Sequence, residues 1–440
     1  MENEKKEVRG IFKGAVFSML VKVAAVGAGF GFNWFLARKL GASGTGLFFL
    51  AFSGLSILSI LSKRGLDRTV LRFISSYVAL GEWHKARAVQ QYAFKKVLIF
   101  GGISSIALWL LSEPLAEYLY KQTEIAPLIR IMAFAVLPLA LLQNTCESLK
   151  GIGKVQLGLI LYGVVVPILA TLVFYLFYIG YSTDYTAAAF GYLFASWLSL
   201  ALTSYFWWLY THKEAAPQPE AISTQELQAS SRPMFWSSVF QQGIMWLPTT
   251  FMPLFLVDTA DIGQFEIAKR TAQLTAFFLV AFNSILAPKI AAMYAKGELG
   301  KIQRISRKTT LMISALASPV FIAFIFFPDF FMSLFGKGFN GGSDMLRYMT
   351  IGQFVNVLCG PVGFLLMMSG HERKMRNSIF ISLLVLAATA FALMPIYGAR
   401  GAAIAVMTAM IVQNLVAVFQ VWKAFRIVTL PFILAKTPKA

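Results

Sequence analysis

The chain has 440 residues, of which 58% are hydrophobic and only 13% are charged, and its mean hydropathy is +0.67. A soluble protein of this length carries more charge than this, so the composition excludes an ordinary soluble fold. The formal net charge is +19. No polar domain is present to carry a folded basic surface, which argues against a nucleic-acid-binding protein.

Apolar stretches of the length that one membrane-crossing helix needs recur along the whole chain. They do not alternate between polar and apolar residues, as the strands of a membrane barrel do. The pattern predicts an all-α polytopic membrane protein with about twelve transmembrane helices. The first of these spans lacks a small-residue cleavage motif, so we expect it to be retained. The predicted spans are residues 11–37, 45–61, 97–112, 128–149, 157–180, 185–210, 234–256, 264–286, 309–328, 346–368, 378–396 and 402–423.

The basic residues are distributed unevenly between the two sides that these spans define. About 29 of the 39 Lys and Arg residues fall on the side that holds both termini, and about 7 fall on the other. Basic loops stay in the cytoplasm, so both termini are predicted to be cytoplasmic. Attraction to anionic headgroups explains the remaining positive charge.

The two cysteines, Cys146 and Cys359, both lie inside predicted spans. This position does not suggest a disulfide framework, and neither cysteine has metal-ligating residues around it. The chain also has no phosphate-binding loop of the form GxxxxGKS or GxxxxGKT. We therefore expect no metal and no cofactor.

The sequence contains signs of an internal duplication. A shift of about 217 residues aligns several landmarks of the two halves. The prediction is an N-terminal six-helix bundle over 1–210, a cytoplasmic linker over 211–233 and a C-terminal six-helix bundle over 234–440. Parallel repeats of this kind are a transporter design, with the substrate between the halves and alternating access. The aligned landmarks are Gly46-Leu-Phe48 with Gly263-Gln-Phe265, Arg72 with Lys289, Tyr77 with Tyr294, Arg130-Ile-Met132 with Arg347-Tyr-Met349, and Gly153 with Gly370.

Four segments carry a family resemblance: "LARKLGASGTGLFFLAFSGLSILSIL", "ILAPKIAAMYAKGELGKIQRISRKTT", "LFGKGFNGGSDMLRYMTIGQFVN" and "MPIYGARGAAIAVMTAMIVQN". Over nearly its whole length the chain resembles O-antigen-type polysaccharide flippases of the multidrug/oligosaccharidyl-lipid/polysaccharide (MOP) exporter superfamily. The resemblance implies two six-helix bundles around a central cavity that helices 1, 2, 7 and 8 line.

The same resemblance implies a function and a location. It implies transfer of undecaprenyl-diphosphate-linked oligosaccharide from the inner to the outer leaflet of the bacterial inner membrane, without ATP hydrolysis. Such transfer serves the biosynthesis of surface polysaccharides such as O-antigen and lipopolysaccharide. The expected partners are this lipid-linked substrate and membrane lipids. A polysaccharide polymerase, chain-length proteins and a coupling ion, H+ or Na+, are open candidates.

Polar side chains inside the predicted spans form the candidate binding site. Lys22 lies about eleven residues into the first span, near mid-membrane, where a cation costs about 3 kcal/mol and needs a cavity or a partner. In the eighth span, Glu266, Arg270 and Gln273 share one helical face, and Lys269 lies about 60° away from it. The face also includes Phe277 and Ser284. The candidate substrate-binding residues are Lys22, Asn33, Glu266, Lys269, Arg270, Gln273, Gln241 and Gln242.

The charges favour one ligand class over its alternatives. Pairing of Glu266 with Lys269 and Arg270 leaves a net positive site, which suits a diphosphate. An antiporter of cationic drugs would need buried carboxylates in excess. A membrane enzyme would need acid and base groups gathered at one face, which no loop offers. Two alternative roles stay open: Lys269 and Arg270 as anchors that reach the headgroups, and the glutamines as interhelical hydrogen-bonding residues.

Overall fold

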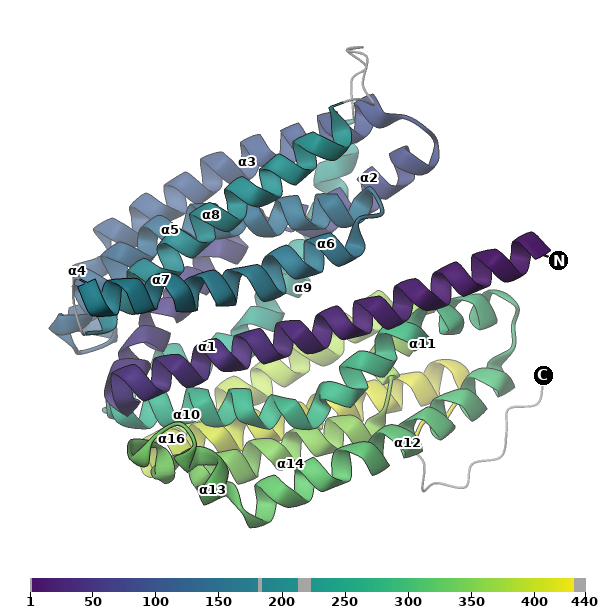
Figure 1. The fold of residues 1–440 in the computed structure, drawn as a ribbon. Helices are drawn as coiled ribbons and strands as arrows, with labels where there is room; N and C mark the ends of the chain where they lie inside the picture. Colours follow the sequence, from purple (N-terminus) through teal and green to yellow (C-terminus); the bar gives the residue numbers. More distant parts are fainter. Residues whose placement is uncertain (1, 181–183, 213–222, 431–440) are drawn as a thin grey trace. The chain divides into compact units, whose positions relative to one another are not determined.

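The computed structural model describes residues 2–180, 184–212 and 223–430 (Figure 1). Every regular element within these ranges is helical. The chain divides into two compact units, Met1–Leu254 and Phe255–Ala440. Low charge and long apolar runs explain the all-helical result, because a helix satisfies its own backbone hydrogen bonds in lipid.

The first unit is built around α5, whose residues are mostly buried. This helix packs against α1, α2, α3 and α8, and α7 packs along α8. The π-helical turn η3 joins α6 to α7. The helices of this unit are α1 (Glu2–Lys63), α2 (Leu66–Ala79), α3 (Trp83–Leu110), α4 (Ser112–Pro114), α5 (Ala126–Gly151), α6 (Val155–Ile160), α7 (Val166–Gly180), α8 (Tyr185–Thr211) and α9 (Thr224–Phe251), with the short turns η1 (Leu115–Leu119), η2 (Thr123–Ile125) and η3 (Leu161–Val165).

In the second unit, α14 takes the central position. It packs against α10, α12 and α16, and the short α15 also packs on α16. The helices are α10 (Thr259–Ala272), α11 (Phe277–Ala295), α12 (Leu299–Phe326), α13 (Pro328–Ser333), α14 (Ser343–Cys359), α15 (Val362–Met368) and α16 (Glu372–Phe425), with the 3-10 turns η5 (Gln273–Ala276) and η6 (Lys337–Gly342). A further 3-10 turn, η4 (Met252–Phe255), precedes this unit.

Each predicted span lies on one described helix or on consecutive helices, but the count of twelve stays a prediction. Seven helices are long and apolar enough to cross a membrane, or eight if Lys337–Cys359 and Val362–Met368 form one bent span. Two of the seven, Met19–Lys63 with 45 residues and Glu372–Phe425 with 54, are each long enough for two crossings of about 20 residues. Two predicted spans do not meet this criterion of length and apolar character. They are 234–256, which lies on α9, and 264–286, which runs from α10 into α11.

Two outward connections predicted as loops are single-residue kinks. The segments "ARKLGAS" and "YGARG" lie inside α1 and α16, which are interrupted only at Gly41 (φ +66°) and Gly398 (φ +54°). Glycine has no Cβ and adopts positive φ readily, so one residue reverses the chain without a polar loop. The predicted loop over 181–184 falls largely outside the described residues.

The contact boundary between Leu254 and Phe255 lies downstream of the predicted linker, and α9 packs with α1 and α2 of the first unit. Residues 213–222 of the linker lie outside the described residues. The duplication therefore stays a prediction. The sequence also predicts amphipathic helices at the inner membrane surface within 62–96 and within 287–308. A separate helix, α2, forms within 62–96, and its place at the membrane surface stays a prediction. No separate helix forms within 287–308, because α11 ends at Ala295 and α12 begins at Leu299.

Candidate functional site

Three of the predicted site residues form a charge cluster on α10. Glu266 is 0% exposed, Lys269 is 6% exposed, and the Arg270 side chain is 20% exposed. Lys269 Nζ donates a hydrogen bond to Glu266 Oε1, and Arg270 Nη2 lies 3.5 Å from Glu266 Oε2. We call these three residues the α10 charge cluster. Its formal charges sum to +1.

The cluster is positioned by ordinary helix geometry. Glu266 precedes Lys269 by three residues and Arg270 by four, which places all three on neighbouring positions of one helix surface. The Lys269 ammonium also lies 5.2 Å from the centre of the Phe265 ring. A buried ion pair is retained only when its partners satisfy each other, because each charge loses its hydration. The burial of Lys269 does not fit a headgroup anchor, which needs its ammonium at the surface.

The predicted polar face does not continue along one straight helix. Gln273 begins the 3-10 turn η5, and α11 starts at Phe277. A 3-10 turn has three residues per turn in place of 3.6, so the helical register changes after Gln273. The prediction assumed 100° per residue along one α-helix. That spacing no longer applies beyond Gln273, so it does not place Phe277 on the face of Glu266 and Arg270. The side chain of Ser284 lies outside the described residues. Gln273 itself is exposed.

Lys22 lies on α1 in the first unit, where it is half-buried and close enough to Lys150 for the two charges to repel. Lys150 is one wall of a polar cavity of about 210 Å³. Two ion pairs line this cavity: Lys63 Nζ to Asp67 Oδ2 at 3.0 Å, and Lys150 Nζ to Glu147 Oε1 at 2.5 Å. The formal charges of these two pairs and Lys22 together sum to +1.

The expected depth of Lys22 changes with the start of its helix. The prediction counted from residue 11, whereas α1 begins at Glu2. Lys22 lies about 28 Å along the helix from the kink at Gly41, which is close to the full thickness of the hydrocarbon core, about 30 Å. If Gly41 marks one membrane surface, Lys22 lies near the other one, and not at mid-membrane.

The predicted amide-bearing residues have different surroundings. Asn33 is buried, and its Nδ2 donates a hydrogen bond to the Gly29 carbonyl of its own helix at 2.7 Å. On α9, Gln241 is exposed and Gln242 is half-buried. Gln241 is therefore accessible to a ligand, whereas the Asn33 amide already makes a local bond.

The candidate residues thus fall into two groups. Lys22, Asn33, Gln241 and Gln242 belong to the first unit, and Glu266, Lys269, Arg270 and Gln273 to the second. The structure brings Glu266, Lys269 and Arg270 together. That both groups line one cavity stays a prediction.

The sequence predicts Glu147 and Lys150 as a surface pair and does not identify the polar cavity that Lys150 lines. The polar cavity is lined by Lys63, Asp67, Gln143, Cys146, Glu147, Lys150 and Tyr162. The four-residue spacing of Lys63 and Asp67 could have indicated their pairing. The 2.7 Å hydrogen bond from Gln143 Nε2 to Tyr162 Oη joins separate helices, so no local signal pointed to it.

Asp67 lies in the first turn of α2, outside the span that ends at Lys63. Burial acts to raise the pKa of Asp67, but the Lys63 ammonium, with Arg68, holds that pKa below its usual value. The carboxylate is therefore charged at neutral pH, and the pair with Lys63 is maintained.

Comparisons with known proteins place this architecture. The profile of a family described as "Polysaccharide biosynthesis protein" matches residues 11–294. A search of the curated proteins gave no match.

Three solved structures share the fold. An inward-facing multidrug resistance MATE family transporter of the MOP superfamily aligns with a TM-score of 0.75 at 15% identity, covering 94% of this chain and 98% of its own. The lipid II flippase MurJ, in an inward closed conformation, aligns with a TM-score of 0.71 at 15% identity, covering 92% and 87%. A MOP superfamily transporter from Pyrococcus furiosus aligns with a TM-score of 0.67 at 14% identity, covering 94% and 94%.

These likenesses establish the fold of the chain as that of MOP superfamily transporters. Together with its apolar helices, they make the chain a multi-pass membrane protein, for which the bacterial inner membrane fits.

Proposed function

We propose a function that proceeds from the family: the chain belongs to the polysaccharide biosynthesis protein family. The proposed function is translocation of undecaprenyl-diphosphate-linked oligosaccharide from the inner to the outer leaflet of the bacterial inner membrane. The chain would work by alternating access of two helical units around a cationic cavity. O-antigen and lipopolysaccharide precursors are the proposed glycan classes.

The α10 charge cluster is the observation that carries this proposal. Its charges sum to +1, and of the three side chains Arg270 is the most exposed. A diphosphate carries the complementary charge, and a guanidinium can hold two phosphate oxygens at once. Arg270 would contact the diphosphate. Glu266 and Lys269, buried behind it, would act as positioning residues that fix the direction of the guanidinium.

The remaining candidate residues have supporting roles in the same proposal. Lys22 would supply a second positive charge from the first unit, beside two ion pairs whose formal charges sum to zero. Gln241, Gln242 and Gln273 would donate hydrogen bonds to sugar hydroxyls or phosphate oxygens. Asn33 would hold the local structure of α1, because its amide bonds the Gly29 carbonyl. The solved structure named as a lipid II flippase shares this fold, which supports a lipid-linked substrate.

Partners and energy coupling extend the proposal. Association with a polysaccharide polymerase and with chain-length proteins is expected for a flippase that supplies their substrate. Coupling to H+ or Na+ would provide the driving force, since the chain has no phosphate-binding loop for ATP.

The second candidate function is export of small cationic molecules, because multidrug transporters share the fold. The α10 charge cluster carries a net positive charge, as does the group formed by Lys22 and the two ion pairs of the polar cavity, and this disfavours a cationic substrate. Overexpression in a drug-sensitive strain tests this alternative, and a rise in resistance to cationic dyes would support it.

Complementation tests the proposed function directly. The host gene is deleted and the chain is supplied as wild type, as Lys22→Ala/Arg270→Ala, or as the control Lys95→Ala/Arg373→Ala. The control removes one exposed Lys from the first unit and one exposed Arg from the second. We expect surface polysaccharide from the wild type and the control, and at least a tenfold loss in the test variant at equal membrane expression. Full surface polysaccharide in the test variant would remove the proposed roles of Lys22 and Arg270.

A further inference from the structure

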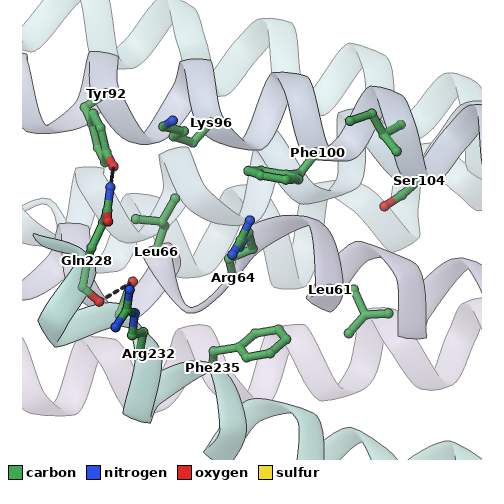
Figure 2. A pocket seen from close by; sticks show the side chains of 12 residues that line it. Leu61, Arg64, Leu66, Tyr92, Lys96, Phe100, Ser104, Gln228, Arg232 and Phe235 are labelled. Atoms are coloured by element: carbon green, nitrogen blue, oxygen red, sulfur yellow. Dashed lines mark hydrogen bonds between the residues drawn. The ribbon is translucent and has the colours of Figure 1, made fainter. Parts of the chain in front are cut away.

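A second basic site lies within the first unit, apart from the candidate substrate-binding residues. It is a cavity of about 560 Å³ between the end of α1, the start of α2, and helices α3 and α9. Figure 2 shows its lining, with Arg64 between the side chains of α3 and those of α9. The lining residues are Leu61, Arg64, Leu66, Tyr92, Lys96, Phe100, Ile103, Ser104, Gln228, Ser231, Arg232 and Phe235.

The charge of this cavity is one-sided. Its lining holds three cations, Arg64, Lys96 and Arg232, and no acidic side chain. Each of the three comes from a different helix or turn. Within the ranges that the structure describes, none of them forms a salt bridge with a carboxylate. Three like charges around one cavity repel each other, and an anion placed among them removes that repulsion.

The turn that carries Arg64 is held in an unusual conformation. Arg64 has φ +51°, a value that few residues with a side chain adopt, and Gly65 follows with φ +76°. A Cβ on Gly65 would lie 2.4 Å from the Ser231 carbonyl oxygen, so α9 packs directly on this turn. The Arg64 guanidinium lies 4.3 Å from the centre of the Phe100 ring. The packing therefore fixes the cation at the cavity wall.

A hydrogen bond closes the polar end of the cavity. Gln228 Nε2 on α9 donates to Tyr92 Oη on α3 at 3.1 Å, as Figure 2 shows. Tyr92 also lies beside Lys96, whose ammonium is 5.8 Å from the ring centre. These contacts join α3 to α9 across the cavity at the end where its polar side chains gather.

The lining changes from polar to apolar along α3. Tyr92, Lys96, Phe100 and Ile103 follow one another at helical spacing, so they face the same side over about 17 Å. The last of them, Ile103, is largely exposed, as are its neighbours Ile99 and Ile106 on the outer surface of α3. A ligand with an anionic head and an apolar chain matches this gradient. The head would meet the cations, and the chain would leave past Ile103 into the surrounding lipid.

We propose that this cavity binds the phosphate of an anionic glycerophospholipid of the surrounding leaflet. Arg64, Lys96 and Arg232 bind the phosphodiester, Tyr92 and Gln228 flank it, and the acyl chains lie along Phe100 and Ile103. Basic cavities between membrane helices on the cytoplasmic side are suited to lipid headgroups. The bound lipid would fasten α9 to α1 and α3. This inference is independent of the lipid-linked substrate proposed for the α10 charge cluster.

The test measures lipid retention by the full chain in nanodiscs of phosphatidylglycerol mixed with phosphatidylcholine. The test variant is Arg64→Gln/Lys96→Gln/Arg232→Gln. The control, Arg68→Gln/Arg72→Gln/Lys95→Gln, removes the same charge from exposed residues outside the lining. Contact of one basic residue with the headgroup contributes about fivefold in affinity, and only the three lining residues make that contact, so the test variant should bind phosphatidylglycerol about a hundredfold more weakly. The control should stay within about fivefold of the wild type.

Three further measurements distinguish a phospholipid from free phosphate and from the lipid-linked substrate, and show that a loss of binding does not come from misfolding. Ser104→Trp fills the cavity without changing charge and should weaken phosphatidylglycerol retention at least tenfold. Millimolar inorganic phosphate should not displace the lipid, because it lacks the apolar chain. Equal loss in the test and control variants would overturn the proposal, as would unchanged retention in Ser104→Trp. Displacement of phosphatidylglycerol by undecaprenyl diphosphate at equimolar amounts would also overturn it, by making the cavity a substrate site.

Discussion

Positions aligned by the predicted duplication have opposite chemistry in the two units. In α10 they hold Glu266, Lys269 and Arg270, and in α1 they hold Phe49, Phe52 and Ser53. Phe49 and Ser53 are buried, as Glu266 and Lys269 are. The positions that the predicted duplication aligns thus hold ion pairs in one unit and packed rings in the other.

The α1 positions form a compact aromatic cluster. The Phe52 ring lies 4.9 Å from that of Tyr192 and 5.4 Å from that of Trp246, both in edge or tilted geometry. Ser53 Oγ donates to the Leu50 carbonyl and accepts a 3.0 Å hydrogen bond from Thr250. Such ring pairs add stability beyond their buried area, and every contact here is neutral.

Under the predicted duplication, this difference indicates where charge was added to a shared scaffold. In the first unit the aligned positions are packed without any charged side chain. Charged groups at the same place cost desolvation energy and bring no folding advantage over apolar ones. Their presence in α10 is therefore explained best by a ligand, and the variants below test this difference.

The largest effect is expected for Glu266→Gln. The change leaves the buried Lys269 and the partly buried Arg270 without the carboxylate that both contact. Breaking a buried ion pair costs about 3–5 kcal/mol, so the free energy of unfolding should fall by that amount. SDS titration of the purified chain in mixed micelles measures it.

Glu298→Gln is the matched control. Glu298 and Lys301 form a pair with the same three-residue spacing in the same unit, but both side chains are accessible. Exposed pairs contribute little, so the loss should be below about 0.5 kcal/mol. Similar losses in both variants would mean that burial of the α10 charge cluster has no energetic consequence.

Phe52→Ala should have the next largest effect. Phe52 is half-buried, so the loss should be about 2 kcal/mol, below the roughly 3–5 kcal/mol for truncation of a fully buried aromatic side chain. Transport per folded molecule should stay near the wild-type value, because the ring serves packing only. Phe134→Ala, at an exposed position of the same unit, should cost clearly less. A loss of transport per folded molecule in Phe52→Ala would contradict the assignment of packing to the aromatic cluster and of ligand binding to the α10 charge cluster.

The smallest effect is expected at the balanced ion pair of the first unit. Asp67→Asn should lower the free energy of unfolding by about 1–2 kcal/mol at pH 7, since Lys63 loses its partner. The folded pKa of Asp67 lies below its usual value, so its stabilisation is complete above the unfolded pKa, near about 3.9. This stabilisation is lost as the pH falls through the pKa that Asp67 has in the folded state.

The free energy of unfolding, measured at pH 7 and in the acid range, checks the direction of this pH dependence. The gap between the wild type and Asp67→Asn should close on acidification. Glu82→Gln, which removes a more accessible partner of Lys85, should show a gap below about 0.5 kcal/mol at pH 7. A gap for Asp67→Asn that stays constant from pH 7 downwards would contradict the assigned role of the carboxylate.

Sequence patterns were sufficient to predict the helices and some of the ion pairs between residues three or four positions apart. Hydropathy located each span on one described helix or on consecutive ones, and spacing predicted the contacts of Glu266 with Lys269 and Arg270. Both signals are local, since they depend on residues within one or two turns.

What the patterns missed depends on contacts between distant segments. The 3-10 turn at Gln273 lies within an apolar run that hydropathy treats as one helix. Arg64 and Arg232 meet at one cavity because α9 packs on the turn at Gly65, and the sequence separation hides this approach. Burial of Lys269 likewise follows from tertiary packing, which periodicity alone does not fix.

Translocation in proteoliposomes tests the central claim most directly. A fluorescent undecaprenyl-diphosphate oligosaccharide is placed in both leaflets, and the fraction that becomes accessible to a membrane-impermeant quencher is followed over time. Wild type and Lys95→Ala/Arg373→Ala should move the lipid at rates within about twofold of each other, and Lys22→Ala/Arg270→Ala should be at least about tenfold slower. Equal rates for all three chains would contradict the assignment of the diphosphate to these cations.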